Sequence, residues 1–372
     1  MRHFQFLILA ALLFLVFSGC EQEKGIAGGD SSGSEYEAEY LSQDEVELLR
    51  KDGHGSFGSI VTADRASGTI SVIDTDSDVV EATIDLPDGP NPAEPMYVVW
   101  TPFSGRVFVG DRANNRVVVF NDRDYSLEGT VPTGSGVFHM WADARESQLW
   151  VNNDIDNTIT VIDPRSLTVL ATIAIPADLV AMGGKPHDVI LDPIGRRAYV
   201  TVLGLSGAND YLLQYSTRNF RELRRAPVGK DPHLSLTFRN PYLYIPCQNT
   251  NEVIILNRFN LRHVKTLPVP GAHGAGMALF ANRFYTTNLP GGGADGLVAI
   301  DTRSNEVINT TDTPYAVPHN IALTPDARRL YITHSGGSSD KVSVFQVGRG
   351  GQLTPAGDIT VGFNPFGLSF AR

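Results

Sequence analysis

Short apolar stretches separated by turn residues recur along most of the chain. The runs "AYVTV", "YLYIP", "RLYIT", "QLWVN" and "RVFVG" resemble one another, and two of them directly follow the turns "PIGRR" and "PDARR". A polar loop comes next, and then a second set of runs such as "NTITVID", "NEVIILN" and "KVSVFQV". β-Branched and aromatic residues bounded by turn residues are typical of β-strands. The pattern therefore predicts an all-β protein whose strands come in repeated groups.

The groups recur at a period of roughly 40 to 48 residues, which is the period of propeller blades with four strands each. First strands are expected to begin at one equivalent position in each repeat: Met96, His139, His187, His233, His273, His319 and Phe366. The chain ends just after the last of these strands, whereas residues 58–87 hold runs for a second, third and fourth strand only. We therefore predict a seven-bladed β-propeller over residues 57–372, in which a C-terminal strand near residues 365–371 completes the N-terminal blade. Closing the ring in this way removes the free sheet edges that promote aggregation.

Several of these stretches resemble known propellers. "RAYVTVLG", "RLYITHSG" and "LWVNND" resemble the YVTN-type repeat, and "GGQLTPAGDITVGFNPFGLSFA" resembles the last blade of lactonase-type seven-bladed propellers. Together the resemblances cover residues 57–372 and imply the same fold. They imply little about activity, because propellers host many unrelated functions.

The N-terminus has the features of a targeting segment. Arg2 and His3 precede the apolar run "FQFLILAALLFLVF", which is too short to span a bilayer comfortably. The segment ends in "FSGC", which resembles the lipobox of bacterial lipoproteins, although Phe17 stands where leucine is usual. The resemblance implies a signal peptide over residues 1–20, a lipid on Cys20 and anchoring in the cell envelope, with the outer membrane favoured because Glu21 is not aspartate. Secretion with cleavage nearby is the alternative.

Composition narrows the classes of partner. Residues 21–56 are polar and acidic, which predicts a flexible linker. The whole chain of 372 residues has a formal net charge of −11 and no cluster of lysine and arginine, so it is a poor candidate for nucleic-acid binding. The sequence contains no CxxCH motif for covalent haem, no Walker loop and no GxSxG elbow. We expect a monomer whose partner is a small-molecule substrate or a redox partner protein.

Histidine is concentrated at one point of the repeat. It follows proline in "GGKPHDVILDP", "KDPHLSLTF" and "YAVPHNIALTP", and it occupies the matching place in "SGVFHMWAD" and "PGAHGAGMALF". Nine histidines in the chain would place far fewer than one at these seven positions by chance, yet five are found there. Because the first strand of each blade is the innermost, His139, His187, His233, His273 and His319 should converge at one mouth of the central channel. A repeat that merely accepts a small polar residue after proline is the alternative.

Imidazole is the commonest metal ligand and suits copper, zinc, iron and nickel. The pairs Pro186-His187, Pro232-His233 and Pro318-His319 resemble the Pro-His pairs of nitrous oxide reductase, whose tetranuclear copper centre lies at the hub of a seven-bladed propeller. The resemblance implies a transition metal at the hub, copper before zinc, held as a small cluster or as one ion on three histidines. Met96 and Phe366 depart from the pattern and no cupredoxin domain follows, so nitrous oxide reduction is not expected.

Loops between second and third strands should lie at the same mouth. They bring His334 as a further imidazole and Cys247 as a thiolate that would favour copper, with a buried, inert thiol as the alternative for Cys247. His263 and His54 are expected to be solvated bystanders. Met96 and Phe366, at the two equivalent positions without histidine, are also predicted to point toward the axis at this mouth. The remaining residues predicted there are polar or charged: Asp111, Arg112, Asn152, Asn153, Asn249 and Asn288.

Three functions fit these features. The first is a metal-binding propeller that acts as a redox enzyme or a metal-binding protein. The second is a lactonase-like hydrolase that uses Arg112 and a neutral histidine at the same mouth. The third is a non-catalytic surface scaffold for protein interaction. The sequence leaves open whether the protein is an enzyme.

Overall fold

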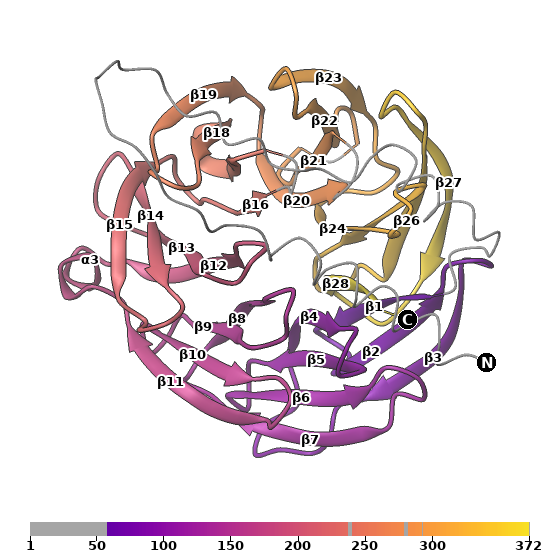
Figure 1. Ribbon diagram of the computed structural model, residues 1–372. Helices are drawn as coiled ribbons and strands as arrows, with labels where there is room; N and C mark the ends of the chain where they lie inside the picture. Colours follow the sequence, from indigo (N-terminus) through magenta and orange to yellow (C-terminus); the bar gives the residue numbers. More distant parts are fainter. Residues whose placement is uncertain (1–57, 237–239, 279–281, 292, 372) are drawn as a thin grey trace, which may run out of the picture. The chain divides into compact units, whose positions relative to one another are not determined.

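The computed structural model describes residues 58–236, 240–278, 282–291 and 293–371. These residues form seven antiparallel sheets of four strands each, arranged as the blades of a ring (Figure 1). Within each blade the strands pair in order from the innermost to the outermost. The prediction of an all-β, seven-bladed propeller is therefore confirmed.

The strands are short, as expected from the length of the apolar runs. Blade 1 consists of β28 (Pro365–Ala371), β1 (Ser59–Asp64), β2 (Thr69–Asp74) and β3 (Val79–Asp85), blade 2 of β4 (Pro95–Thr101), β5 (Arg106–Asp111), β6 (Arg116–Asn121) and β7 (Leu127–Pro132), and blade 3 of β8 (Val137–Ala142), β9 (Leu149–Asn153), β10 (Thr158–Asp163) and β11 (Thr168–Ala174). Blade 4 consists of β12 (Lys185–Leu191), β13 (Arg197–Leu203), β14 (Asp210–Ser216) and β15 (Glu222–Val228), and blade 5 of β16 (Ser235–Leu236), β17 (Tyr242–Cys247), β18 (Glu252–Asn257) and β19 (His263–Pro268). Blade 6 consists of β20 (Ala272–Ala278), β21 (Arg283–Asn288), β22 (Leu297–Asp301) and β23 (Glu306–Thr311), and blade 7 of β24 (Pro318–Leu323), β25 (Arg329–His334), β26 (Lys341–Val347) and β27 (Leu353–Thr360).

The two ends of the described chain meet in blade 1. Strand β28 pairs antiparallel with β1, with Ser59 opposite Ala371 and Ile60 opposite Phe370. In Figure 1 the yellow β28 therefore lies beside the indigo β1. The predicted closure of the ring by the C-terminal strand is confirmed.

The core consists of seven apolar clusters, and each cluster lies between two neighbouring blades. Between blades 3 and 4, for example, Trp150 packs with Leu213, and at the closing interface Ile60 packs with Tyr331. Middle strands such as β1 are buried at every residue, whereas the outermost strand β3 alternates between exposed and half-buried residues. This difference explains why continuous apolar runs mark the middle strands and weaker alternation marks the fourth.

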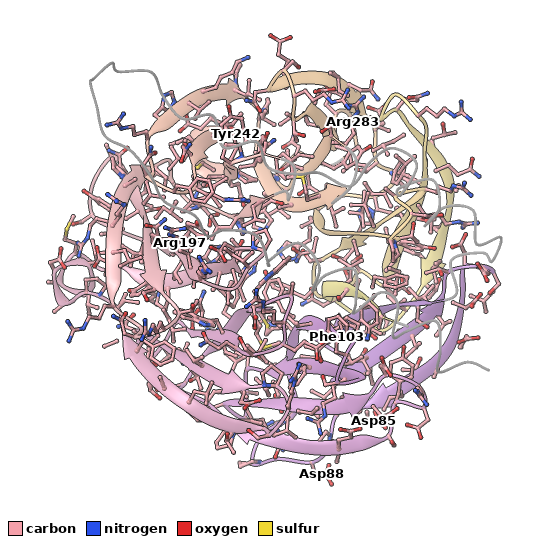
Figure 2. All side chains as sticks on the ribbon, viewed as in Figure 1. Asp85, Asp88, Phe103, Arg197, Tyr242 and Arg283 are labelled. Carbon is pink, nitrogen blue, oxygen red and sulfur yellow. The ribbon has the colours of Figure 1, made fainter. Side chains whose placement is uncertain are left out.

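Blades follow one another through links from an outermost strand to the next innermost strand. In Figure 2, Asp85 at the end of the outer strand β3 and Asp88 in the link to β4 lie toward the edge of the ring, whereas Phe103 between β4 and β5 lies nearer the centre. Two short helical segments, α3 (Ala177–Ala181) and η1 (Gln248–Thr250), lie in connections between strands. Within the described ranges, no helix has the length and apolar character needed to cross a membrane. The predicted signal peptide (1–20) and linker (21–56) lie outside the described residues.

Candidate metal site

A β-bulge recurs near the start of the innermost strands. In blade 3, Phe138 and His139 together stand opposite the single residue Asn152, because Val137 pairs with Asn153 and Met140 pairs with Val151. The same shift of register occurs in blades 1, 2, 4, 6 and 7, at the residue pairs Phe366–Gly367, Met96–Tyr97, His187–Asp188, His273–Gly274 and His319–Asn320. Bulges re-aim side chains and are common beside functional sites. Here they let two consecutive residues of one strand contribute to the hub.

Close packing explains why glycine occupies the second bulge position in blades 1 and 6. A Cβ atom on Gly274 would lie 2.0 Å from the carbonyl oxygen of His319, and one on Gly367 would lie 2.5 Å from that of Met96. The innermost strands of neighbouring blades therefore approach too closely for any side chain there. In blades 6 and 7 the close approach accompanies the contact between His273 and His319, whose ring centroids are 4.9 Å apart.

The five predicted histidines gather in one buried cluster. The ring centroids of His139, His187 and His233 are 5.1 Å (His139 to His187), 5.5 Å (His139 to His233) and 4.7 Å (His187 to His233) apart. The row continues from His233 to His273 at 3.8 Å and from His273 to His319 at 4.9 Å. Each of the five is less than a tenth exposed. The structure therefore brings together the residues that the sequence pattern selected.

Two carboxylates that the sequence analysis did not select join the cluster. One oxygen of Asp188 lies 3.0 Å from Nδ1 of His139, and the other lies 3.9 Å from Nδ1 of His233. Oδ1 of Asp231 lies 3.4 Å from Nε2 of His187 and 3.8 Å from Nε2 of His233. Their position in "PHD" and "KDPH", directly beside Pro-His pairs, is the signal that could have identified them.

The backbone holds both carboxylates in place. Asp188 accepts hydrogen bonds of 2.7 Å from the backbone N–H groups of Val189 and Leu234, in two neighbouring blades. Asp231 has a φ of 59°, in the left-handed region that a residue with a side chain rarely adopts. Such strain is found at functional sites, where the surrounding structure compensates for it.

Burial favours the neutral form of four imidazoles: His187, His233, His273 and His319. Desolvation lowers the pKa values of His187, His233 and His273 well below the usual histidine value, and neighbouring histidines lower them further. Burial likewise lowers the pKa of His319 to about 4. Burial and the nearby Asp210 raise the pKa of Asp231. A neutral imidazole has a free lone pair, which is the form that coordinates a metal.

The cluster satisfies the geometric needs of a metal ion. Nε2 of His187 and Nε2 of His233 are 3.3 Å apart, and Oδ1 of Asp231 lies 3.4 Å from the former. Ligands of about 2.0–2.1 Å around a tetrahedral ion are about 3.3–3.4 Å from one another. Among the described residues, two groups have ligand atoms that all lie within 4.8 Å of one another: His139 with His187 and His233, and Asp231 with His233 and His273.

Buried ring nitrogens without hydrogen-bond partners among the described residues also favour a metal site. Nδ1 of His139 faces Asp188, whereas its buried Nε2 has no hydrogen-bond partner among the described residues. Both ring nitrogens of His273 are likewise buried and unpartnered in the described part of the chain. Buried polar atoms without partners are uncommon because each costs free energy. A bound ion or ligand would satisfy them.

Aromatic rings border the cluster. The Tyr97 ring stacks on His139 at 3.8 Å, and the Phe138 ring lies 5.2 Å from His187. Phe366 lies 4.1 Å from the ring of His319. The guanidinium groups of Arg112 and Arg65 lie 5.5 Å above Phe138 and Phe366 respectively.

Two predicted ligands lie outside the cluster. Cys247 is fully buried in the apolar cluster between blades 4 and 5, and burial raises the pKa of its thiol, which disfavours the thiolate form that binds metal. His334 uses both ring nitrogens elsewhere, with Nδ1 3.0 Å from the carbonyl oxygen of Ala316 and Nε2 2.8 Å from Oγ of Ser343. Both residues end second strands rather than entering the loop, so their side chains face the interior of the blades. The inert-thiol alternative describes Cys247 better.

Most of the other predicted mouth residues support loops. Asp111 binds Arg116 at 2.9 Å, and Arg112 pairs with Asp154 at 2.8 Å. Met96, which the repeat alignment also places at the channel mouth, is completely buried in the core between blades 2 and 3. Tyr97, the second residue of the same bulge, stacks on His139 at the hub.

The asparagines have separate roles. Asn152 donates a hydrogen bond of 2.9 Å to the carbonyl oxygen of His187, and Asn153 contacts the hydroxyl groups of Thr158 and Thr160. Asn288 accepts from the N–H of Gly291, and Asn249 is exposed. His263 is exposed on β19, as predicted, and His54 and Cys20 lie outside the described residues.

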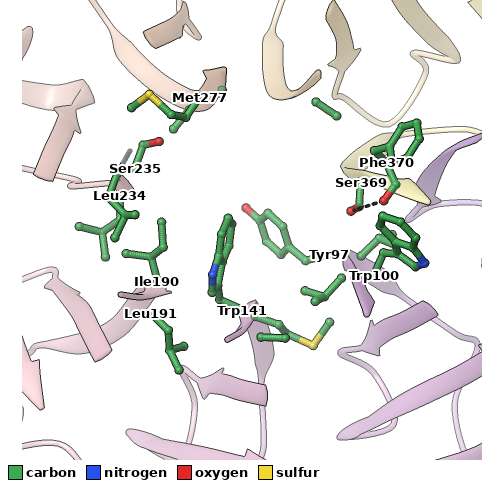
Figure 3. A pocket seen from close by; sticks show the side chains of 18 of the residues that line it. Tyr97, Trp100, Trp141, Ile190, Leu191, Leu234, Ser235, Met277, Ser369 and Phe370 are labelled. Atoms are coloured by element: carbon green, nitrogen blue, oxygen red, sulfur yellow. Dashed lines mark hydrogen bonds between the residues drawn. The ribbon is translucent and has the colours of Figure 1, made fainter. Parts of the chain in front are cut away.

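A cavity of about 580 Å³ extends from the cluster along the channel. His139, His233 and Asp188 line its inner end, and residues from the turns that follow the innermost strands line its other end. Figure 3 shows Tyr97, Trp141, Ile190 and Met277 around this space. The cavity gives a small molecule access to the histidines from the side opposite Phe138 and Phe366, which do not line it.

Comparison with known proteins bears on the fold. No family model and no curated protein matches this chain. Among solved structures, the periplasmic gluconolactonase of Pseudomonas aeruginosa is similar, with 17% identity and a TM-score of 0.67 over 85% of this chain and 99% of that one. Hydrazine synthase of Kuenenia stuttgartiensis has 14% identity and a TM-score of 0.59 over 76% and 90% of the two chains. The dihydro-haem d1 dehydrogenase NirN has 14% identity and a TM-score of 0.57 over 86% and 76%. At these identities the likeness concerns architecture, and it places the chain among seven-bladed β-propellers with lactonase-like structural neighbours.

Proposed function

We propose that this protein binds one divalent transition-metal ion at the hub of the propeller. His139, His187 and His233 supply the three nitrogen ligands, and Asp231 supplies a carboxylate oxygen. The observation that carries the proposal is the close spacing of three ligand atoms. Nε2 of His187 lies 3.3 Å from Nε2 of His233 and 3.4 Å from Oδ1 of Asp231, which are tetrahedral spacings, and the third separation, from Nε2 of His233 to Oδ1 of Asp231, is 3.8 Å. Asp188 orients His139 through its Nδ1, as carboxylates do for metal-binding histidines.

The donor atoms bear on the identity of the metal. The expectation of copper before zinc rested partly on a thiolate from Cys247, which lies in the core instead. The remaining donors are imidazole nitrogen and carboxylate oxygen, a set that zinc accepts in tetrahedral sites. Copper binds imidazole more tightly than zinc does, so geometry rather than affinity is what favours zinc here. We therefore propose zinc, with copper as the competitor.

Elemental analysis tests this proposal. Protein expressed with copper and zinc available should carry close to one equivalent of metal. The double variant His187→Ala/His233→Ala should carry none, whereas His263→Ala, which removes an exposed histidine on the outer strand β19, should keep the full amount. Wild-type protein that carries neither metal and takes up neither on dialysis contradicts the proposal.

A lactonase-like hydrolase is the second candidate, with two observations in its favour. The fold is similar to that of the periplasmic gluconolactonase, and His273 presents two unpartnered ring nitrogens beside the proposed ion. A bound divalent ion polarises a carbonyl group. His273, which burial keeps neutral, can accept a proton from an attacking water. Arg112 is less suited to the role first considered for it, because Asp154 neutralises its charge.

Lactone hydrolysis by the metal-loaded protein tests the hydrolase. His273→Gln should keep the bound metal and lower kcat at least 100-fold, in line with the loss of a general base. If no lactone is hydrolysed while the metal is bound, a redox enzyme, a metal-binding protein or a scaffold becomes the better description.

We also propose that the protein is anchored in the cell envelope through a lipid on Cys20, with the outer membrane as the site. The support is the sequence "FSGC" followed by a polar segment.

A further inference from the structure

The cavity that leads to the histidines has walls of uniform character. The innermost strands line it with the apolar side chains Val98, Ile190, Leu236, Met277, Ile321 and Leu368. Trp141 also lies in this wall, and 43% of its surface is exposed. A large aromatic side chain with that much exposed surface inside a channel offers a stacking surface to a ligand.

The charged groups of the cavity lie at its ends, and the hydroxyl groups of Ser235 and Ser369 interrupt the apolar wall between them. Tyr97, Asn320, His139 and Asp188 lie at the inner end. At the outer end are the carboxylates of Asp143, Glu146 and Asp192, each of which accepts hydrogen bonds from turn residues. A concave apolar site of roughly 300–1,000 Å³ with a few convergent polar groups is the usual form of a small-molecule site. The cavity volume of about 580 Å³ falls in this range.

The charged residues that line the cavity limit which ligands can bind in it. None of the described residues that line the cavity is a lysine or an arginine, whereas four are aspartate or glutamate: Asp143, Glu146, Asp188 and Asp192. In the metal-free channel, an anion would lose its hydration without gaining a cationic partner, and it would be repelled by the carboxylates; only the proposed metal ion at the inner end would attract it. A neutral molecule has no charge to dehydrate, and the carboxylates do not repel it.

We infer that the channel binds an uncharged small molecule with a flat apolar body, whose polar end faces the histidine cluster. The apolar body stacks on Trp141 between Ile190 and Met277, and the polar end reaches His139 and Tyr97 (Figure 3). The inference adds a ligand class to the proposed metal site. It rests on the proposed metal in one respect only, namely whether the polar end of the ligand contacts a bound ion or the histidines themselves. It excludes phosphorylated sugars and sugar acids as ligands that enter through this channel.

A matched pair of probes tests the charge rule. Binding of 2-naphthol and of 2-naphthoate, which share a ring system and differ in charge at neutral pH, is measured by calorimetry and ligand-observed NMR on the full chain. We expect 2-naphthol to bind at least tenfold more tightly than 2-naphthoate. Equal binding of the two probes, or binding of neither, overturns the inference.

Variants locate the binding in the channel. Met277 is half-buried on β20, so Met277→Lys can place a cation in the cavity without opening the core. It should weaken 2-naphthol binding at least tenfold and admit 2-naphthoate, whereas the matched Met277→Leu should behave as wild type. Trp141→Ala should weaken 2-naphthol at least fivefold, whereas Ile155→Ala, which removes an exposed apolar side chain from a loop that does not line the cavity, should not. Unchanged binding in both Met277→Lys and Trp141→Ala overturns the inference.

Each measurement is made on chelator-treated and on zinc-loaded protein, so that the two proposals can fail separately. A protein that binds 2-naphthol with the expected charge rule but retains no metal contradicts the metal site alone. If the protein retains metal as purified, but after chelator treatment binds 2-naphthol no better than 2-naphthoate, the channel inference alone is contradicted. The charge rule is measured on the chelator-treated protein because the carboxylate of 2-naphthoate can coordinate a bound ion.

Discussion

Nδ1 of His139 lies 3.0 Å from a carboxylate oxygen of Asp188, the residue that directly follows His187 in the next blade. Two neighbouring blades are thereby joined at the hub, and the Nε2 of His139 is the nitrogen left for a ligand. The same carboxylate accepts backbone hydrogen bonds from Val189 and Leu234, so it is itself held rigidly.

Asp188→Asn should lower metal affinity about 10- to 100-fold, because the amide no longer orients and polarises His139 as a carboxylate does. The measurement is competition with a chelator of known affinity. The control is Asp192→Asn, which should leave the affinity unchanged. Asp192 directly follows the innermost strand β12, at the end away from Asp188. An equal loss in both variants would indicate general destabilisation.

The free energy of unfolding of the metal-free protein should decrease as the pH is lowered below about 6.5. The folded-state pKa of His319 is about 4, whereas the unfolded chain has the ordinary value near 6.5, so the unfolded state binds more protons between these values. Stability is therefore full above pH 6.5 and decreases as the pH falls to 4, by about 3 kcal/mol from His319 alone. His187, His233 and His273 shift in the same direction and add to the loss.

Urea unfolding at several pH values, with a chelator present, measures this dependence. His319→Gln should show a smaller slope than the wild type between pH 4 and 6.5. A stability that is flat across this range would contradict the burial of neutral imidazoles.

Removal of residues 363–372 should abolish cooperative unfolding. Strand β28 supplies the partner of β1 and places Leu368 and Ala371 in the clusters on the two sides of blade 1. Its loss would leave blade 1 with an unpaired edge and two open interfaces. Thermal unfolding followed by circular dichroism tests this, and Phe363→Ala, at an exposed residue, should stay within about 0.5 kcal/mol of the wild type.

Cys247→Ala should keep the full metal content, because the thiol lies in the core and burial raises its pKa. The wild-type thiol should react with a thiol reagent only after unfolding. If copper binds to the wild type and is lost in Cys247→Ala, the thiolate ligand first predicted from sequence is correct after all.

Cys20→Ala should release the protein from membranes in fractionated cells, since it removes the proposed site of lipidation. Residues 1–57 lie outside the described structure, so this prediction rests on the sequence alone. A variant that stays in the membrane fraction through salt and carbonate washes would contradict lipid anchoring.

The order of apolar runs and turns was enough to determine the architecture. Blades repeat because each needs the same set of buried strands, so the period, the strand count and the closure of β28 on β1 could be derived from residue spacing alone. The convergence of His187, His273 and His319 followed from the same logic, because equivalent positions in a closed ring face one axis. His139 stands one residue later than the alignment predicted, at the second position of its bulge, where blade 4 has Asp188.

The tertiary structure decided which neighbours complete the site. Side chains alternate along a regular strand, so sequence reasoning would place Asp188 on the face opposite His187 and treat Met96 as the equivalent of a histidine. The bulges break that alternation: they turn Tyr97 and Asp188 toward the hub, while Met96 is buried in the core. A bulge is a shift of register between two strands, and its position depends on the pairing of both, which no single run of residues encodes. Cys247 and His334, correctly placed near the ends of second strands, face the interior of the blades rather than the ring of histidines, because packing against the neighbouring strands and blades holds them there.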